Sequence, residues 1–117
     1  MKRFLKLQWN ELKKMFSKYK MQILNVVKSN RKGKKYTAIL SDGKEVHFGS
    51  DVSTTFIEGA SQAKKDAYLA RHLANDVERE RVEKMIMSPA LLSAYLLWNT
   101  PSLQKNIQVL NRELRKK

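Results

Sequence analysis

The sequence lacks cysteine altogether and holds only two histidines among its 117 residues. Without cysteine there are no disulfide cross-links and no thiol chemistry, and two histidines are too few for a structural zinc site. We therefore expect neither a metal nor another cofactor. The hydrophobic content of 42% is enough for one domain with a modest core.

Long hydrophobic runs are missing as well. The longest extends from Ala90 to Trp98, contains Ser93, and is about half the length of a membrane span. The first five residues resemble the start of a signal peptide, but Lys6 and Glu11 interrupt the apolar region that export requires. We expect a soluble protein that touches a membrane peripherally at most.

Acidic residues are scarce in the first third of the chain. Residues 1–35 contain 12 Lys and Arg against Glu11 alone, whereas residues 36–117 contain 12 basic and 10 acidic residues. The formal net charge of +13 is therefore concentrated at one end. Such asymmetry indicates attraction to nucleic acid, to an anionic membrane or to an acidic protein surface.

Residues 1–20 are predicted to form a basic amphipathic helix, an extension to a single α+β domain over residues 21–117. Apolar side chains recur there at helical spacing with lysines opposite them; they are Leu5, Trp9, Leu12, Met15, Phe16 and Tyr19. Packing on the sheet or on a neighbouring subunit is the commoner fate of such a stripe. The alternative is that the helix lies on an anionic bilayer.

A small three-stranded antiparallel sheet is predicted next. Its strands are Gln22–Lys28, Tyr36–Leu40 and Glu45–Phe48, with a turn over residues 29–33. Asp42-Gly43 is a strong hairpin signal. A two-residue turn there places Ile39 opposite Val46, Thr37 opposite Phe48 and Ala38 opposite His47.

Three C-terminal helices are predicted to pack on this sheet after a polar linker from Gly49 to Ala60. Ser61 caps a helix from Gln62 towards Asn75, which continues as exposed helix over Asp76–Lys84. The pairs Ser88-Pro89 and Thr100-Pro101 then open the helices Ala90–Trp98 and Leu103–Leu114. The apolar stripe of the last helix consists of Leu103, Ile107, Leu110 and Leu114.

The basic residues suggest a polyanion-binding surface, of which the turn around Gly33 is the centre. Lysine and arginine side chains of this kind bind phosphates, and nothing in the sequence resembles a base-reading element, so binding is expected to ignore base sequence. A solvated turn is the alternative interpretation. The candidate residues are Lys13, Lys14, Lys18, Arg31, Lys32, Lys34, Lys35 and Arg71.

The C-terminal half is more apolar than a single helix face requires. This excess indicates either the main core or a patch for a protein partner. The candidate interface residues are Met85, Met87, Leu92, Tyr95 and Trp98.

No catalytic site is predicted. Tyr68, Arg71 and His72 share one helix face, but no nucleophile or second acid-base group accompanies them, so hydrogen bonding at the edge of the core or contact with an acidic partner is favoured. His47 is expected to be a sheet residue rather than a metal ligand. We expect no small-molecule substrate.

Three stretches of the chain resemble a known family. They are Lys34-Lys35-Tyr36 leading to Gly43-Lys44 and Val46-His47-Phe48-Gly49; Lys64-Lys65 with Tyr68, Arg71 and His72; and Leu96-Leu97-Trp98-Asn99 with Pro101 and Leu103. In this order they resemble small, basic, uncharacterised proteins of large double-stranded DNA viruses of algae and protists, over roughly residues 26–110. The sequence departs from that pattern at Ser50–Glu58, which lacks an aromatic-Asp-Tyr-Thr segment, and at Leu92–Tyr95, where more tryptophan and arginine are typical.

The resemblance implies a viral protein without known catalytic activity. We expect a virion structural protein of the minor-capsid or cement type, located in the virion and in the host cytoplasm during assembly. Its partners would be capsid or other virion proteins on one side and an acidic surface on the other. The alternative is a DNA-binding protein that packages the viral genome without sequence preference.

Overall fold

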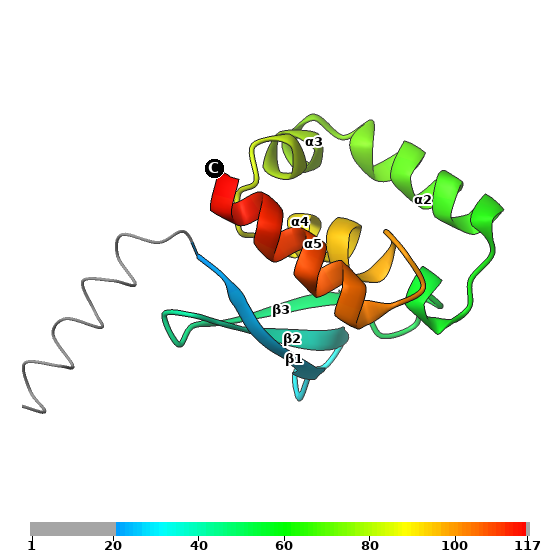
Figure 1. Ribbon diagram of the computed structural model, residues 1–117. Helices are drawn as coiled ribbons and strands as arrows, with labels where there is room; N and C mark the ends of the chain where they lie inside the picture. The colour runs from blue at the N-terminus through cyan, green and yellow to red at the C-terminus, as the bar shows by residue number, and fades with distance from the viewer. Residues whose placement is uncertain (1–20, 117) are drawn as a thin grey trace, which may run out of the picture.

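Three strands build one antiparallel sheet in the order β1-β2-β3. The computed structural model describes residues 21–116, which contain β1 (Ile23–Lys28), β2 (Lys34–Leu40) and β3 (Glu45–Ser50). Helices α2 to α5 all lie on the same side of this sheet (Figure 1). The predicted α+β class and three-stranded sheet are confirmed, whereas the predicted helix over residues 1–20 lies outside the described residues.

The predicted register of the β2–β3 hairpin is wrong by one residue. Ala38 pairs with Val46 and Tyr36 pairs with Phe48, because the loop has three residues instead of two. Gly43 has a φ of 87° and its N–H donates to the carbonyl of Leu40, which adds a left-handed residue after the turn. Tyr36, Ala38 and Leu40 therefore share one face of β2 with their partners Val46 and Phe48, and His47 pairs with Thr37.

A bulge in β1 interrupts its register with β2 next to its one buried residue. The register shifts between Ile23, which is 3% exposed, and Asn25, so that the intervening Leu24 is left 65% exposed. The side chain of Asn111 holds this point of the edge strand from helix α5. The N–H of Ile23 donates to Asn111 Oδ1 at 2.7 Å, and Asn111 Nδ2 donates to the carbonyl of Ile23 at 3.0 Å.

Local side-chain caps set the beginnings of the helices. Ser61 Oγ accepts from the N–H of Lys64, and Ser88 Oγ accepts from the N–H of Leu91, as predicted. The helical elements are the 3-10 turn η1 (Phe56–Glu58), α2 (Gln62–Leu73), α3 (Asp76–Glu83), α4 (Pro89–Leu92), the π-helical turn η2 (Ser93–Leu97) and α5 (Leu103–Lys116).

Two predicted helix boundaries are corrected. The helix expected to run on into Asp76–Lys84 breaks, because Asn75 Oδ1 accepts from the N–H groups of Val77 and Glu78 and starts a separate helix, α3. The last helix is capped by Ser102, whose Oγ accepts from the N–H of Lys105, rather than by Thr100. The described residues thus contain four α-helices where three were expected.

The core lies between one sheet face and the segment α4–η2–α5. Leu91, Leu92 and Leu96 are all 0% exposed, as is Phe48 on β3. The predicted stripe of α5 is confirmed, since Leu110 and Leu114 are buried in this core and Leu103 and Ile107 pack against it. Within residues 21–116, no helix is long and apolar enough to cross a membrane.

Asn106 is a polar residue inside this core with 0% exposure. Its Nδ2 donates to the carbonyls of Leu96 and Thr100, each at 2.9 Å. Its Oδ1 accepts from the N–H and the hydroxyl of Thr100, at 3.1 Å and 2.6 Å. One side chain therefore ties α5 to the end of η2 and to the loop between them.

Replacing Asn106 with alanine should lower the free energy of unfolding by about 2–4 kcal/mol, because the buried Leu96 carbonyl and the Thr100 N–H lose their partners. Urea unfolding measures this loss. Gln108→Ala, at an exposed position of the same helix, is the control and should change stability by less than about 0.5 kcal/mol. Equal effects of the two substitutions would contradict the role given to Asn106.

Candidate functional site

A cleft of about 360 Å³ lies between the end of the sheet and helix α2. Lys34 and Ser50 border it from β2 and β3, and Lys64 and Arg71 border it from α2. Residues of α4 and η2, among them Ser93, also line it. Parts of the chain that are far apart in sequence thus meet around one hollow.

The lining carries more positive than negative charge. Lys34, Lys64 and Arg71 supply three cations, and Glu78 is the carboxylate among the lining residues. Glu78 Oε2 lies 2.6 Å from Nδ1 of His72, which also lines the cleft. In the described part of the chain, none of the three cations forms an ion pair with a carboxylate. The cleft is therefore suited to an anion.

An aromatic stack holds α2 against the core. The Tyr68 ring lies on Trp98 with 4.4 Å between centroids and an angle of 10°, and on His72 with 4.1 Å and 29°. None of the residues of α2 is buried. The stack is therefore a main attachment of this helix to the core.

Tyr68 keeps its proton well above neutral pH. Burial raises the pKa of Tyr68 to about 12, and the Glu78 carboxylate adds to the rise, while a hydrogen bond with Ser93 and the Arg71 charge oppose it. The phenol is thus protonated at neutral pH.

Lys65 provides a second attachment of α2. Its Nζ donates to the carbonyl of Asn99 at 2.6 Å and lies 4.9 Å from the centroid of the Phe56 ring. This lysine points to the core side of the helix, whereas its neighbour Lys64 lines the cleft.

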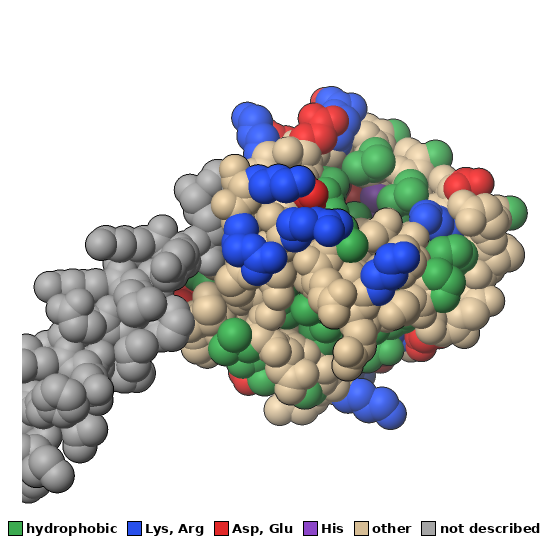
Figure 2. Space-filling view, in the orientation of Figure 1, with side chains coloured by type: hydrophobic (Ala, Val, Ile, Leu, Met, Phe, Trp, Pro, Cys, Tyr) green, Lys and Arg blue, Asp and Glu red, His purple; other side chains and the backbone are tan. Residues whose placement is uncertain are grey.

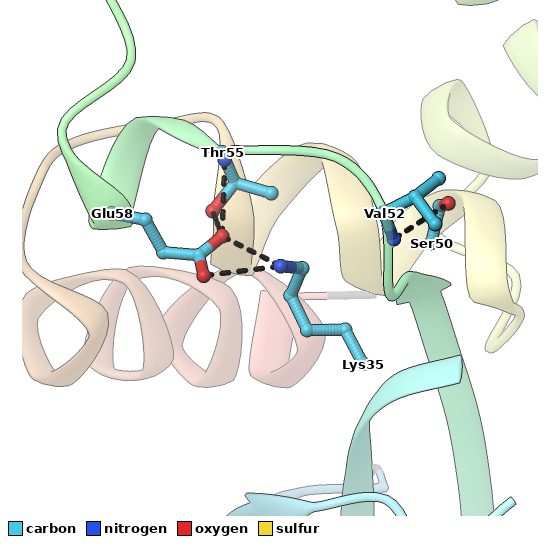
Figure 3. Close-up of polar contacts among 5 residues, drawn as sticks. All are labelled: Lys35, Ser50, Val52, Thr55 and Glu58. Atoms are coloured by element: carbon cyan, nitrogen blue, oxygen red, sulfur yellow. Dashed lines mark hydrogen bonds and ion pairs between the residues drawn. The ribbon is translucent and has the colours of Figure 1, made fainter. Parts of the chain in front are cut away.

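The loop after β3 forms another wall of the cleft and is fixed by a charge cluster (Figure 3). Glu58 Oε1 accepts from the N–H of Thr55 at 3.0 Å and from its hydroxyl at 2.8 Å. Lys35 Nζ lies 2.9 Å from the same oxygen. Burial alone would raise the pKa of Glu58, but the bonds from Lys35 and Thr55 hold this pKa below its usual value.

Gly49 lets β3 pass close to the helical layer. Its φ is 80°, and a Cβ there would stand 3.0 Å from Leu97 Cδ1 and 3.2 Å from Lys35 Cβ. A side chain at this position would be strained and would push into the cleft wall.

The predicted polyanion-binding residues divide into groups. Lys34 and Arg71 line the cleft together, and Arg31 and Lys32 are exposed in the turn next to it. Lys35 is instead engaged with Glu58, with its side chain only 13% exposed. The remaining predicted cations, Lys13, Lys14 and Lys18, lie outside the described residues.

The predicted protein-interface residues lie mostly in or against the core. Leu92 is 0% and Trp98 is 4% exposed, so both are core residues of this chain and are closed to a partner in this conformation. Met85, Met87 and Tyr95 are partly buried and pack against the same core. The apolar excess that suggested a docking patch is thus used largely for internal packing.

The two histidines have structural partners. His47 lies in β3, as expected, with Nδ1 2.7 Å from the Thr37 hydroxyl and 2.8 Å from that of Ser29. His72 stacks on Tyr68, and its Nδ1 lies 2.6 Å from Glu78 Oε2, which agrees with hydrogen bonding at the edge of the core, one of the two predicted alternatives. Residues 21–116 contain no cluster of three or more His, Cys, Asp or Glu that could hold a metal ion.

Lys64 and a set of cations on α5 were not among the residues predicted to bind a polyanion. Lys64 stands four residues before Tyr68 and seven before Arg71, a helical spacing that would have placed it on their face. Helix α5 exposes a second set, and Figure 2 shows Lys and Arg side chains gathered over this helix. These are Lys105, Arg112, Arg115 and Lys116.

A spectrophotometric titration of the tyrosines should show one that ionises near pH 12, absent from the Tyr68→Phe variant. Because the pKa is raised from 10.0 in the folded protein, its contribution to stability is complete below pH 10.0 and is lost as the pH rises towards about 12. Urea unfolding over this alkaline range should therefore show a steeper loss for the wild type than for Tyr68→Phe. Titration of every tyrosine near 10.0 would refute the buried environment of Tyr68.

The chain was compared with known proteins. Residues 24–72, which span the sheet and α2, match a family of unknown function (DUF5754). The match includes all three cations of the cleft, Lys34, Lys64 and Arg71, and ends before α3. No curated protein and no solved structure matches the chain. The chain is thus similar, from β1 to α2, to a family described as one of unknown function.

Proposed function

We propose that this chain is a non-enzymatic protein that binds the phosphate backbone of nucleic acid without reading base sequence. The proposal rests on one observation: Lys34, Lys64 and Arg71 line the same cleft. Among the described residues, none of these three cations forms an ion pair with a carboxylate. Arg31 and Lys32 extend this positive surface into the exposed turn before β2. Phosphate groups are the ligands that such a surface attracts.

The shape of this surface supports contact with phosphates rather than with base edges. The exposed basic residues lie in a short turn and on one side of α2, and they are Lys and Arg at irregular spacing. If five cations each neutralise one phosphate, the logarithm of the binding constant should fall against the logarithm of salt with a slope of about −4 to −5.

A binding role also agrees with the state of the titratable groups in the cleft. Tyr68 stays protonated up to about pH 12, so that its phenol is a hydrogen-bond donor rather than a negative charge at neutral pH. The cleft offers fixed positive charges, which favour binding.

A virion structural role of the minor-capsid or cement type is the second proposal. It rests on the resemblance to proteins of large double-stranded DNA viruses, and the exposed apolar side chains of edge strand β1 support it. Leu24 is 65% and Val27 is 41% exposed there, and a strand edge with apolar side chains favours pairing with another chain. Capsid proteins would be the partners, in the virion and in the host cytoplasm during assembly.

Random-sequence duplex DNA should bind the protein with the salt dependence given above, as measured by fluorescence anisotropy. Lys34→Glu should weaken binding roughly tenfold, because a cation at the cleft becomes an anion. Lys44→Glu makes the same change of charge in the β2–β3 hairpin, where the side chain is 81% exposed, and should cost less than about twofold. Lys35 is unsuitable for this test because its loss would break the bond to Glu58.

Equal losses from Lys34→Glu and Lys44→Glu would show that net charge alone drives binding, and would overturn the site. Binding that persists unchanged at high salt would contradict phosphate contact altogether. Binding to anionic vesicles without binding to DNA would instead support a peripheral membrane role.

For the virion role, the protein should stay with purified shells after nuclease has removed the genome, as detected by immunoblotting of gradient fractions. Val27→Lys should release it, because the charge disrupts an apolar contact at the β1 edge. Val52→Lys is the control, since Val52 is 88% exposed in a loop away from that edge. Release of the wild-type protein together with the genome would reject this proposal and favour nucleic-acid binding.

A further inference from the structure

The cleft belongs to a basic surface, and it is also large enough to hold a small ligand. Its volume is about 360 Å³. Sites for small molecules and cofactors in proteins begin at about 300 Å³. The hollow therefore has room for a whole nucleotide.

We propose that this cleft binds a nucleoside phosphomonoester, either as the phosphate-bearing end of a nucleic-acid strand or as a free mononucleotide. The inference deepens the proposed function, since the same cations take part, and it adds a preference for one kind of phosphate. The shared chemistry of both sources is a phosphate joined to one carbon.

Charge is the first argument for a phosphomonoester. Three cations from two elements surround the cleft, Lys34 on β2 and both Lys64 and Arg71 on α2. A phosphodiester carries one negative charge, whereas a phosphomonoester carries about −1.5 to −2 at neutral pH. Glu78 contributes one opposing charge, which His72 hydrogen-bonds at 2.6 Å. The three cations and the one carboxylate leave a net positive charge at the cleft, which matches the charge of a phosphomonoester better than that of a phosphodiester.

Hydrogen-bond donors at the same place are the second argument. Ser53 lines the cleft, and within residues 21–116 its hydroxyl has no protein partner. By contrast, Ser50 Oγ accepts from the N–H of Val52, and the Thr55 hydroxyl donates to Glu58. The Ser53 hydroxyl and the Arg71 guanidinium are thus both available to phosphate oxygens.

The aromatic stack at the cleft leaves no open ring face for the base of a nucleotide. Tyr68 is sandwiched between Trp98 and His72, and Trp98 is only 4% exposed. The stack therefore offers no free face of Tyr68 or Trp98 for a base to lie on. Recognition rests on the phosphate, and the base identity should matter little.

The test uses the full chain and two kinds of probe. In the first, fluorescence anisotropy compares single-stranded oligonucleotides that differ only in a terminal phosphate or a terminal hydroxyl, at each end in turn. In the second, a thermal shift assay compares 5′-AMP with adenosine and with inorganic phosphate. The site predicts at least fivefold tighter binding of the phosphate-ended strand, or a melting-temperature increase with 5′-AMP that adenosine does not give.

Arg71→Gln should abolish the preference for the terminal phosphate, so that the phosphate-ended and hydroxyl-ended strands bind with a ratio of about one. This result is expected whatever the substitution does to total affinity. Arg112→Gln removes the same charge from the exposed face of α5 and should leave the preference intact. A preference for the strand assigns the ligand to nucleic-acid ends, and a response to 5′-AMP alone assigns it to the free nucleotide.

Equal binding of both strands together with no response to 5′-AMP would overturn the phosphomonoester site. That result would leave the proposed function standing as long as duplex binding still depends on salt and on Lys34. Conversely, a response to 5′-AMP with no binding of any nucleic acid would keep the site and reject the proposed function. A response to inorganic phosphate equal to that for 5′-AMP would overturn the nucleoside part of the inference.

Discussion

The burial of one leucine-rich segment against one sheet face is the constraint on which the rest of this structure depends. Residues 91–97 include four leucines, each at most 1% exposed, and they pack over the face that carries Ala38 and Phe48. At about 25 cal/mol for each Å² of apolar surface, such burial is the dominant favourable term in folding. Asn106 and Asn111 then fasten α5 to this layer and to the edge strand through buried or partly buried hydrogen bonds.

Helix α2 is held differently, and the cleft is the result. None of its residues is fully buried. The Tyr68 stack and the Lys65 contacts hold it in place, together with the partly buried Leu69 and Leu73. The space left between α2 and the sheet end is lined by groups that need not be apolar, and cations are placed there without the cost of burying an unpaired charge.

The positive charges of the described residues therefore fall into two classes. Some are neutralised within the fold, as Lys35 is by Glu58 and Lys84 by Glu80. Others, such as Lys34 and Lys64, point at solvent or at the cleft without a carboxylate partner in residues 21–116. Charges of the second class repel one another and bring little stability, and the proposed function gives them an anionic ligand.

The sequence by itself determined the local elements. The Ile and Val residues of 22–28 specified β1, and Asp42-Gly43 specified the β2–β3 hairpin. The serines at positions 61 and 88 specified helix starts, and the spacing of Leu110 and Leu114 specified the inner face of α5. These features depend on neighbours within a few residues, and that is the range over which periodicity and capping act. The basic character of a candidate site around Lys34 and Arg71 was also visible at this level.

Only the tertiary structure decided the register, the core membership and the composition of the cleft. The left-handed Gly43 moved the hairpin by one residue, and packing made Leu92 and Trp98 core residues rather than interface residues. Lys35 and Lys34 are adjacent in sequence, yet one is paired with Glu58 and the other borders the cleft with Arg71. Such differences arise from contacts between residues far apart in the chain, whose distances no local pattern encodes.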